Sequence, residues 1–399
     1  MEKFSVRHAQ PHEFSAVADL IAQVFFGYNK ARAQQARHDW LFNRPRAPGF
    51  DYAAYRVGVL SDDDTERIIA HTVVSPHTLR YGSVFLRVSG VGFVCTHPDY
   101  RRSGYTSAVM HDSLAYMAEQ GTHLALLDGI HSFYNRFGFS SVFPVYSFEV
   151  DSAQAAHLPM PLRLRPPTQQ DVPYMAALYQ KHWSGRVTFT RSADLWLWRV
   201  AVADRPFMQV VEDARGHICG YIAASYETDD RAEVIADSMD AALTLLAAAG
   251  ERFQQAGIKR VTWLIPPDDA LVYYARQVLP VRVSASYQPN GGWMARIIDT
   301  EALVSTLLPE LIAQAHSTMP DLQVSALEFV CEPDVVQIGL KGKPETCSRI
   351  SHQDFIQVMF GSLRPAMLAL RSGMSSDALR LLEALFPPRM AALACWDWF

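Results

Sequence analysis

The chain has 399 residues, of which 49% are hydrophobic and 19% charged, and its formal net charge at pH 7 is −5. This length predicts two or three domains with sizeable cores. The acidic balance argues against a nucleic-acid-binding protein and is compatible with a cationic acceptor molecule. No apolar run reaches the roughly 18 residues of a membrane span, and the opening residues do not read as a secretory leader. We therefore expect a cytoplasmic protein without nucleic-acid partners or membrane spans.

The first predicted elements are a strand at 4–7 and a helix whose first turn contains Pro11, a residue suited to the start of a helix. The helix carries a periodic set of apolar residues, Phe14, Val17, Leu20, Ile21 and Val24. Two antiparallel strands are expected at 53–60 and 68–74. The acidic run between them reads as a solvated hairpin tip.

The stretch 89–139 carries the functional signal. A predicted strand at 89–98 leads into a basic, glycine-containing turn at 99–106. The helix that follows has apolar residues on one face, namely Met110, Leu114 and Met117. A second apolar strand is expected at 124–127.

The order strand, basic turn and helix suits a pyrophosphate group. The first turn of a helix leaves its N–H groups without partners, and the helix dipole adds partial positive charge there. Gly104 would let the backbone approach an anion closely, and Arg101 and Arg102 add donors and charge. The turn is therefore a candidate phosphate-binding site.

This turn reads Arg-x-x-Gly-x-Thr from Arg101 to Thr106 and resembles the Q/R-x-x-G-x-G/A acetyl-CoA loop of the GNAT N-acetyltransferases. Thr106 stands where that family usually has Gly or Ala. Further along, 133–139 is similar to the family's F-Y-x-x-x-G-F segment. The resemblance implies an α/β fold with mixed sheets and acetyl-CoA as co-substrate, and the cysteine spacing indicates no metal. The implied coenzyme-binding residues are Phe93, Val94, Thr96, Arg101, Arg102, Ser103, Gly104, Tyr105 and Thr106.

The resemblance also implies roles in acyl transfer. Tyr134 would protonate the departing thiolate of coenzyme A, since an ordinary tyrosine pKa of about 10 keeps its proton in place at neutral pH. In this family the first helix and the segment after it line the acceptor pocket. The implied wall residues, for which plain core packing is the alternative, are Phe25, Phe26, Tyr28 and Trp40.

The second part of the chain repeats the first in outline. The segment 164–179 parallels the strand and helix near the start, and 257–264 parallels 121–127. We interpret this as an internal duplication. The second copy lacks an Arg-x-x-Gly turn and has an acidic stretch at 232–237 instead. From about residue 293 the pattern changes, with Thr300 as an expected helix cap and further helices expected at 352–360, 363–371 and 376–386.

This layout is similar to that of the Eis-like aminoglycoside acetyltransferases, which join two tandem GNAT units to a domain with the sterol-carrier-protein fold. The resemblance implies a homo-oligomer, a trimer or a hexamer. It further implies a catalytic GNAT acetyl-CoA-binding domain at 1–150, a degenerate second GNAT-like domain at 151–290 and a sterol-carrier-protein-like α/β domain at 291–399. Those enzymes attract polycationic sugars with acidic residues, whereas this chain has the aromatic, slightly basic segment 25–30. That difference favours a smaller or more apolar amine.

The general base has several candidates. Eis-like enzymes use the carboxylate of the C-terminal residue, which is Phe399 here. Burial beside Trp398, itself a candidate substrate-binding residue, would raise the pKa of that carboxylate toward the working pH. An apolar tail that packs only for stability is the alternative. Other candidate bases are His97, His131 and Asp128.

We therefore expect an acetyl-CoA-dependent N-acetyltransferase that acts on a primary amine. The acceptor would be an aminoglycoside-like or polyamine-like small molecule, or a lysine. Transfer of a longer acyl group is a second enzymatic reading. A non-catalytic protein that senses acetyl-CoA or carries a lipid is the alternative from another class, and product formation from acetyl-CoA would exclude it.

Overall fold

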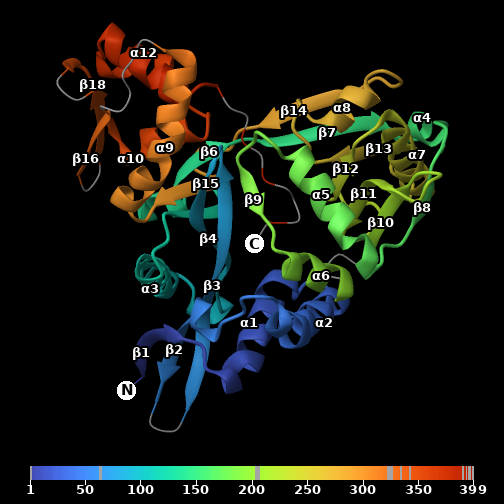
Figure 1. Cartoon of the computed structure of the whole chain (residues 1–399). Coiled ribbons are helices and arrows are strands. Elements are labelled where there is room, and N and C mark those ends of the chain that lie inside the picture. The colour runs from blue at the N-terminus through green and yellow to red at the C-terminus, as the bar shows by residue number, and fades with distance from the viewer. Residues whose placement is uncertain are drawn as a thin grey trace. The chain divides into compact units, whose positions relative to one another are not determined.

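The structure is a computed structural model (Figure 1). It describes residues 2–62, 65–202, 207–320, 327–332, 335–340, 343–388, 391, 393 and 397. The chain forms two compact units. Unit 1 combines Met1–Phe143 with Gln288–Arg389, and unit 2 combines Pro144–Tyr287 with the C-terminal segment Met390–Trp398. Both mix helices with β-sheets, which confirms the expected α/β class. Within the described ranges no helix has both the length and the hydropathy of a membrane span.

A mixed β-sheet runs through unit 1. Its strands follow in the order β1-β2-β3-β4-β5-β15-β6. They are β1 (Lys3–His8), β2 (Tyr55–Ser61), β3 (Glu66–Tyr81), β4 (Val84–Thr96), β5 (Leu124–Gly129), β6 (Ser140–Phe143) and β15 (Gly292–Ile297). β4 and β5 are parallel, because helix α3 (Tyr105–Glu119) carries the chain from the end of one to the start of the other. The other neighbours are antiparallel.

Two helices cover opposite faces of this sheet. Helix α1 (Phe14–Phe26) packs into a buried cluster that includes Val73 of β3. Helix α3 packs into a cluster that includes the next residue, Val74. Consecutive strand residues point to opposite faces of a sheet, so α1 and α3 lie on opposite sides. The apolar face expected for α3 is confirmed, since these residues are buried: Met110, Leu114 and Met117. A second short helix, α2 (Lys30–His38), follows α1.

The C-terminal part of unit 1 is a small antiparallel sheet with four helices. The strands β16 (Leu327–Glu332), β17 (Val335–Leu340) and β18 (Lys343–Ser351) pair in this order. The helices are α9 (Thr300–Thr318), α10 (His352–Met359), α11 (Pro365–Ser372) and α12 (Ser376–Leu385). The three helices expected after residue 350 are thereby confirmed. The cap expected at Thr300 is wrong by one residue, because the Asp299 side chain accepts the N–H of Ala302 at 2.9 Å.

Polar contacts join this part of unit 1 to the hairpin between β3 and β4. The hydroxyl of Tyr81 donates to the carbonyl of Met359 at 3.1 Å. The N–H of Ser83 donates to the buried carboxylate of Glu310 at 2.9 Å. The hairpin end of the sheet is therefore held by α9 and the end of α10.

Unit 2 contains two sheets, ordered β12-β11-β10-β8 and β13-β7-β14. Its strands are β7 (Val145–Asp151), β8 (Arg163–Arg165), β9 (Thr188–Thr190), β10 (Phe207–Glu212), β11 (Ile218–Ala224), β12 (Glu233–Ala236), β13 (Arg260–Trp263) and β14 (Arg282–Ser286). Its helices are α4 (Ser152–Ala156), α5 (Val172–His182), α6 (Ala193–Ala201), α7 (Met239–Gln255) and α8 (Ala270–Ala275). Helix α7 packs against both sheets, since its apolar residues share a cluster with β7, β11 and β13.

The two units share one strand order, with one strand exchanged. β8, β10, β11 and β12 follow one another as β1 to β4 do, and β13 and β14 correspond to β5 and β6. Between β5 and β6 lies β15, which follows the whole of unit 2's main segment in sequence. Between β13 and β14 lies β7, which directly follows β6 in sequence. The sheet of unit 1 therefore combines strands from before and after the main segment of unit 2, whereas the strands of unit 2 all lie within Pro144–Tyr287.

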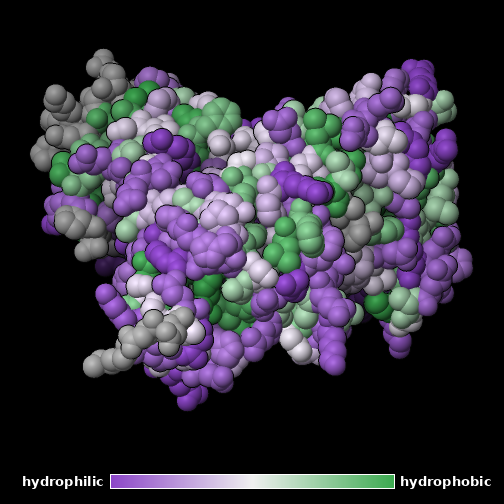
Figure 2. Space-filling model, turned by 90° about the horizontal axis from the view of Figure 1, so that it is seen from below, coloured by the Kyte–Doolittle hydropathy of each residue, from purple (hydrophilic) through white to green (hydrophobic). Residues whose placement is uncertain are grey.

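The surface is largely hydrophilic on the face that Figure 2 shows, with hydrophobic side chains gathered in small patches. Scattered apolar side chains on a surface are ordinary for a folded protein. The strongly exposed ones include Tyr28, Ile130, Tyr287 and Leu370.

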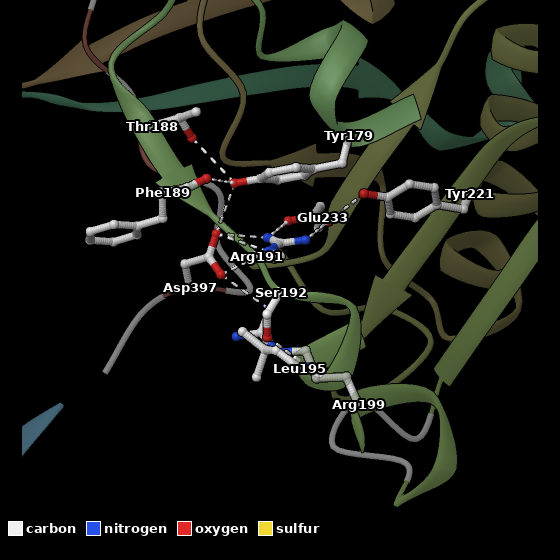
Figure 3. A network of polar contacts seen from close by, with 10 residues as sticks. All are labelled: Tyr179, Thr188, Phe189, Arg191, Ser192, Leu195, Arg199, Tyr221, Glu233 and Asp397. Atoms are coloured by element: carbon white, nitrogen blue, oxygen red, sulfur yellow. Dashed lines mark hydrogen bonds and ion pairs between the residues drawn. The ribbon is translucent and has the colours of Figure 1, made fainter. Parts of the chain in front are cut away.

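A buried ion network occupies the interior of unit 2 (Figure 3). Arg191, whose side chain is 0% exposed, contacts the Glu233 carboxylate through Nη1 at 2.8 Å and Nη2 at 2.5 Å. Its Nε and Nη2 donate to Asp397 at 2.8 and 2.7 Å. Arg199 and the hydroxyl of Tyr179 each donate to Asp397 at 3.1 Å. Two cations thus face two carboxylates, one of which comes from the last residues of the chain.

Neutralising Asp397 should destabilise the protein strongly. In Asp397→Asn, Arg191 and Arg199 would each lose a carboxylate partner in a buried setting. Breaking a buried ion pair by changing one partner costs about 3–5 kcal/mol. Urea unfolding followed by tryptophan fluorescence measures the loss.

The matched control is Asp19→Asn, the same change in an exposed ion pair. The side chains of Asp19 and its partner Arg37 are 55% and 45% exposed, and exposed pairs contribute about 0–1 kcal/mol. Equal losses in the two variants would contradict a stabilising role for the buried network.

Candidate active site

The turn between β4 and α3 presents exposed backbone N–H groups. β4 ends at Thr96, a 3-10 turn spans Pro98–Tyr100, and α3 begins at Tyr105. Arg102 and Gly104 have φ angles of 66° and 85°, and residues 101–104 are exposed. Gly104 is the N-cap and supplies no side-chain cap. The first N–H groups of α3 therefore lie open to an anion, as a phosphate site requires.

Thr106, which departs from the small-residue pattern, ties α3 to the end of β4. Its hydroxyl lies 2.5 Å from the hydroxyl of Thr96. The Nε of Arg101 donates to the Thr96 carbonyl at 3.4 Å. The ring of Tyr105 packs on Phe4, with 4.5 Å between ring centroids. These contacts hold the turn against the sheet.

β4 and β5 part next to this turn. They pair at Val88–Gly90 with Leu124–Leu126, although β4 continues to Thr96 and β5 to Gly129. Both strands are fully described, and no later pair joins them. The last residues of β4 therefore have an edge without a neighbouring strand.

The N–H groups of Val94 and Thr96 face this open edge. The N–H of His97 donates to the carbonyl of Ile69 in β3 at 2.7 Å. Since N–H groups on one edge of a strand recur at every second residue, Cys95 shares the edge toward β3. Val94 and Thr96 then face the other edge. Phe93 lies at the irregular point of the strand, with φ of 49°.

Tyr134 begins the short 3-10 helix Tyr134–Phe137 that follows β5. Its side chain packs between aromatic rings, with centroids 4.9 Å from Phe133 and 6.2 Å from Phe139. Burial raises the pKa of Tyr134 to about 12, and the charges of Asp128 and Cys95 act in the same direction. The phenol is therefore protonated throughout the neutral range and holds a proton that a thiolate can take.

Three of the predicted aromatic residues come together. The ring of Phe93 lies 4.8 Å from that of the buried Trp40 and 5.5 Å from that of Phe25. Phe25, at the end of α1, is 37% exposed, so this cluster reaches the surface. Tyr28 is 77% exposed and lies outside the cluster. Phe26 contacts Phe25, with 6.3 Å between centroids.

A cation lies over this aromatic cluster. The guanidinium carbon of Arg44 is 4.9 Å from the ring centroid of Trp40 and 5.5 Å from that of Phe93. Stacking of a guanidinium on aromatic rings is favourable. A fixed positive charge at this place disfavours a polycationic acceptor.

The candidate bases occupy different settings. Asp128 lies near enough to Tyr134 for its charge to raise the pKa of the phenol. His131 is exposed, and its Nδ1 lies 2.7 Å from the carbonyl of Pro289. His97 begins the turn and contributes to a hollow of about 440 Å³ that Tyr134 does not line. Phe399 and Trp398 lie outside the described residues.

His71 is a site residue that sequence reasoning missed. It lies in β3 among apolar residues and is 1% exposed. Its Nδ1 lies 3.2 Å from the carbonyl oxygen of Phe93. A histidine inside the largely apolar run 68–74, in which Thr72 is the other polar residue, was the signal that could have found it. As to metals, the described side chains include no group of three or more His, Cys, Asp and Glu residues able to hold an ion.

Comparison with known proteins agrees with this geometry. Residues 5–142 match the family described as Acetyltransferase (GNAT) domain. No curated protein matches the chain in sequence. The fold is similar to that of a GCN5-related N-acetyltransferase from Kribbella flavida, at 15% identity and a TM-score of 0.64, covering 100% of this chain and 99% of that chain.

Two further solved structures are similar over their full length. One is a conserved protein of unknown function from Enterococcus faecalis V583, a probable N-acyltransferase, at 14% identity, a TM-score of 0.67 and 100% coverage of both chains. The other is Eis1 from Mycobacterium abscessus, at 15% identity, a TM-score of 0.57 and 100% coverage of both chains. At such identities the likeness shows a shared fold. Together with the family match, it identifies an acyltransferase domain of the GNAT type within the chain.

Substitution of Gly104 should weaken coenzyme binding. A Cβ at this position meets no atom within 4 Å, so the cost in Gly104→Ala comes from its φ of +85°. A left-handed conformation costs an L-residue roughly 1–2 kcal/mol, and relief of that strain would turn the N–H groups of α3 away from the anion. We expect the Kd for coenzyme A, measured by calorimetry, to rise about tenfold, the equivalent of ~1.4 kcal/mol.

Gly257→Ala is the matched control in unit 2. Gly257 has φ of +74° and equally open surroundings, so the same strain arises far along the chain from the turn. This variant should lose similar stability and keep the affinity for coenzyme A. If both variants bound the coenzyme with wild-type affinity, the turn would not be its binding site.

Proposed function

We propose that the protein is an acetyl-CoA-dependent N-acetyltransferase acting on a primary amine. The observation that carries the proposal is the open edge of β4 beside the N-terminus of α3, with Tyr134 after the neighbouring strand. The edge would hold the pantetheine and the thioester, and the turn Arg101–Thr106 would hold the pyrophosphate. Acetyl-CoA is the co-substrate in this proposal, and no metal takes part.

The proposed reaction is direct transfer. The neutral amine attacks the thioester carbonyl carbon, and the N–H groups of Val94 and Thr96 stabilise the oxygen as it gains charge. The carbon–sulfur bond then breaks, and the thiolate takes the proton of Tyr134. The nitrogen gives its extra proton to a base, so that the products are an amide and free coenzyme A.

We propose the carboxylate of Phe399 as that base. The resemblance to the Eis-like enzymes, which use the carboxylate of the C-terminal residue, supports this choice. Asp128 is the alternative that Tyr134's environment favours, since its charge acts on the phenol.

The acceptor we propose is a primary amine of a small molecule or of a lysine, and within this class the polycationic aminoglycoside-like and polyamine-like amines are less favoured than amines of low charge. The cluster of Phe25, Trp40 and Phe93 supports an acceptor with an apolar body. The cation of Arg44 beside it supports a low positive charge rather than a polycation. An acyl group longer than acetyl is the second enzymatic reading, which the same aromatic cluster would accommodate.

The wider architecture belongs to the proposal as well. The shared strand order of the two units supports a tandem of GNAT-like domains, the second without a coenzyme site. The sheet β16-β17-β18 with its helices is consistent with a sterol-carrier-protein-like domain. By resemblance we propose a cytoplasmic homo-oligomer, a trimer or a hexamer, that has no nucleic-acid partner.

Tyr134→Phe tests the proposed acid. Loss of the hydroxyl should lower kcat for thiol release from acetyl-CoA about 100-fold or more, because general acids contribute on that scale. The affinity for coenzyme A should remain. With a pKa of about 12, the wild-type phenol stays protonated as the pH rises, so kcat should not fall through this group until the pH nears that value.

The matched control is Tyr273→Phe, which removes a tyrosine hydroxyl from the second repeat, where the side chain is 54% exposed. It should leave kcat unchanged. Wild-type kcat in Tyr134→Phe would remove the tyrosine from the mechanism. Bound coenzyme A without thiol release from wild type, across a panel of amines, would instead favour a sensor or a lipid carrier.

A C-terminal amide tests the proposed base. Semisynthesis that converts only the Phe399 carboxylate to a carboxamide removes one charge and adds almost no volume. We expect kcat to fall about 100-fold while coenzyme affinity persists, and a ligated chain with the natural carboxylate is the control. Equal kcat in the two products would rule out the terminal carboxylate and turn attention to Asp128, His97 and His131.

A further inference from the structure

His71 has a polar contact that the reaction as proposed leaves unused. The residue lies in β3, is 1% exposed, and places Nδ1 3.2 Å from the carbonyl oxygen of Phe93. A carbonyl only accepts, so Nδ1 carries the proton and donates it. Nε2 is then an acceptor, and it is buried without a hydrogen-bond partner among the described residues.

The imidazole is neutral in this setting. Burial lowers the pKa of His71 to about 4, the contact with Phe93 opposes that shift, and the charge of Arg44 adds to it. Aromatic rings surround the imidazole, with centroids 5.8 Å away at Trp40 and 6.1 Å away at Tyr55. An apolar side chain would fit such surroundings without leaving a buried nitrogen unpaired. The role of this histidine must therefore depend on its single hydrogen-bond donor, the Nδ1–H group.

That donor acts where the ladder between β3 and β4 is interrupted. Their register shifts between His71 and Val73, and Phe93 opposite has φ of +49°, which an L-residue adopts at a cost. The hydroxyl of Thr72 donates to the carbonyl of Gly92 at 3.2 Å. Two consecutive side chains of β3 thus contact two consecutive carbonyls of β4 at this irregularity.

Holding the Phe93 carbonyl also orients the next N–H group. The carbonyl of Phe93 and the N–H of Val94 belong to one planar trans peptide and point in opposite directions. With its oxygen directed to His71 in β3, this peptide directs its N–H to the open edge of β4. That edge is where the thioester carbonyl is proposed to lie.

We propose that His71 is a positioning residue for acyl transfer, whose Nδ1–H holds the Phe93–Val94 peptide so that the Val94 N–H meets the developing oxyanion. This inference rests on the proposed function. In this inference a side chain, rather than the backbone hydrogen bonds between β3 and β4, holds the irregular part of the strand in place. The imidazole itself touches neither the coenzyme nor the acceptor.

Three substitutions of His71 separate its donor from its volume. Asn places an N–H donor close to the position of Nδ1, Gln places one nearer to Nε2, and Leu has none. We expect kcat for thiol release to fall at least tenfold in His71→Leu and His71→Gln, because the Val94 N–H would no longer be held toward the oxyanion. His71→Asn should stay within about threefold of wild type. The affinity for coenzyme A should be unchanged in all three.

The control is His123→Leu, which removes another buried histidine of unit 1. His123 is 4% exposed, and its Nδ1 accepts the N–H of Arg87 at 3.3 Å. This variant should lose stability and keep kcat. A fall in kcat as large as that of His71→Leu would mean that turnover reports general destabilisation, and would overturn the inference.

Hydrogen exchange gives a reading that needs no turnover. The amides of 91–97 should exchange faster in His71→Leu than in wild type, and His71→Asn should restore slow exchange. Equal amide exchange rates in all variants would overturn the role of His71. An active wild type and His71→Leu with the same kcat would overturn it as well, and in both cases the proposed function would stand. If the wild-type protein released no thiol with any amine, the proposed function itself would be wrong. That result would differ from one in which the wild type is active and only the role of His71 fails.

Discussion

The parting of β4 from β5 is the constraint on which the proposed site depends. A strand inside a sheet normally uses both edges, and a buried N–H without a partner is costly. Here β4 loses its parallel neighbour after Gly90, so its last N–H groups require a ligand or water. The free edge ends where α3 begins, which places strand donors and helix donors along one continuous stretch of backbone. Tyr134 follows the other strand of the parted pair. One local divergence thus supplies the binding edge and the place of the proposed acid.

The insertion of β15 between β5 and β6 links this site to a distant part of the chain. The GNAT match ends at residue 142, yet the sheet that carries the open edge includes β15 (Gly292–Ile297), which pairs with β5 along its whole length. β7 completes a sheet of unit 2 in the corresponding place. A fragment that stopped at residue 142 would therefore expose an edge of β5 that is paired in the full chain, and unpaired edges promote aggregation.

Charged residues in the interior can have a role that the sequence pattern does not indicate. In the sequence, the acidic stretch 232–237 stands in place of the Arg-x-x-Gly turn of the first copy. In the structure Glu233 is buried and forms two hydrogen bonds with Arg191. Its charge therefore balances a cation inside unit 2. His71 is the converse case, since its place in β3 beside Ala70 and Thr72 gave no indication of the carbonyl it would meet.

The sequence by itself determined the turn at Arg101–Thr106 and the helix after it, and its resemblance to the GNAT family pointed to the segment around Tyr134. The turn and the helix rest on sterics, helix capping and periodicity, which act among residues a few positions apart. The tertiary structure alone decided the exchanged strand, the contact of His71 with Phe93 and the anchoring of Asp397 by Arg191, 206 positions away. Such contacts depend on which distant segments pack together, and the side chains involved satisfy donors and charges only after burial has removed water. No local sequence pattern encodes which distant segments pack together, because water on an exposed surface could satisfy the same polar side chains equally well.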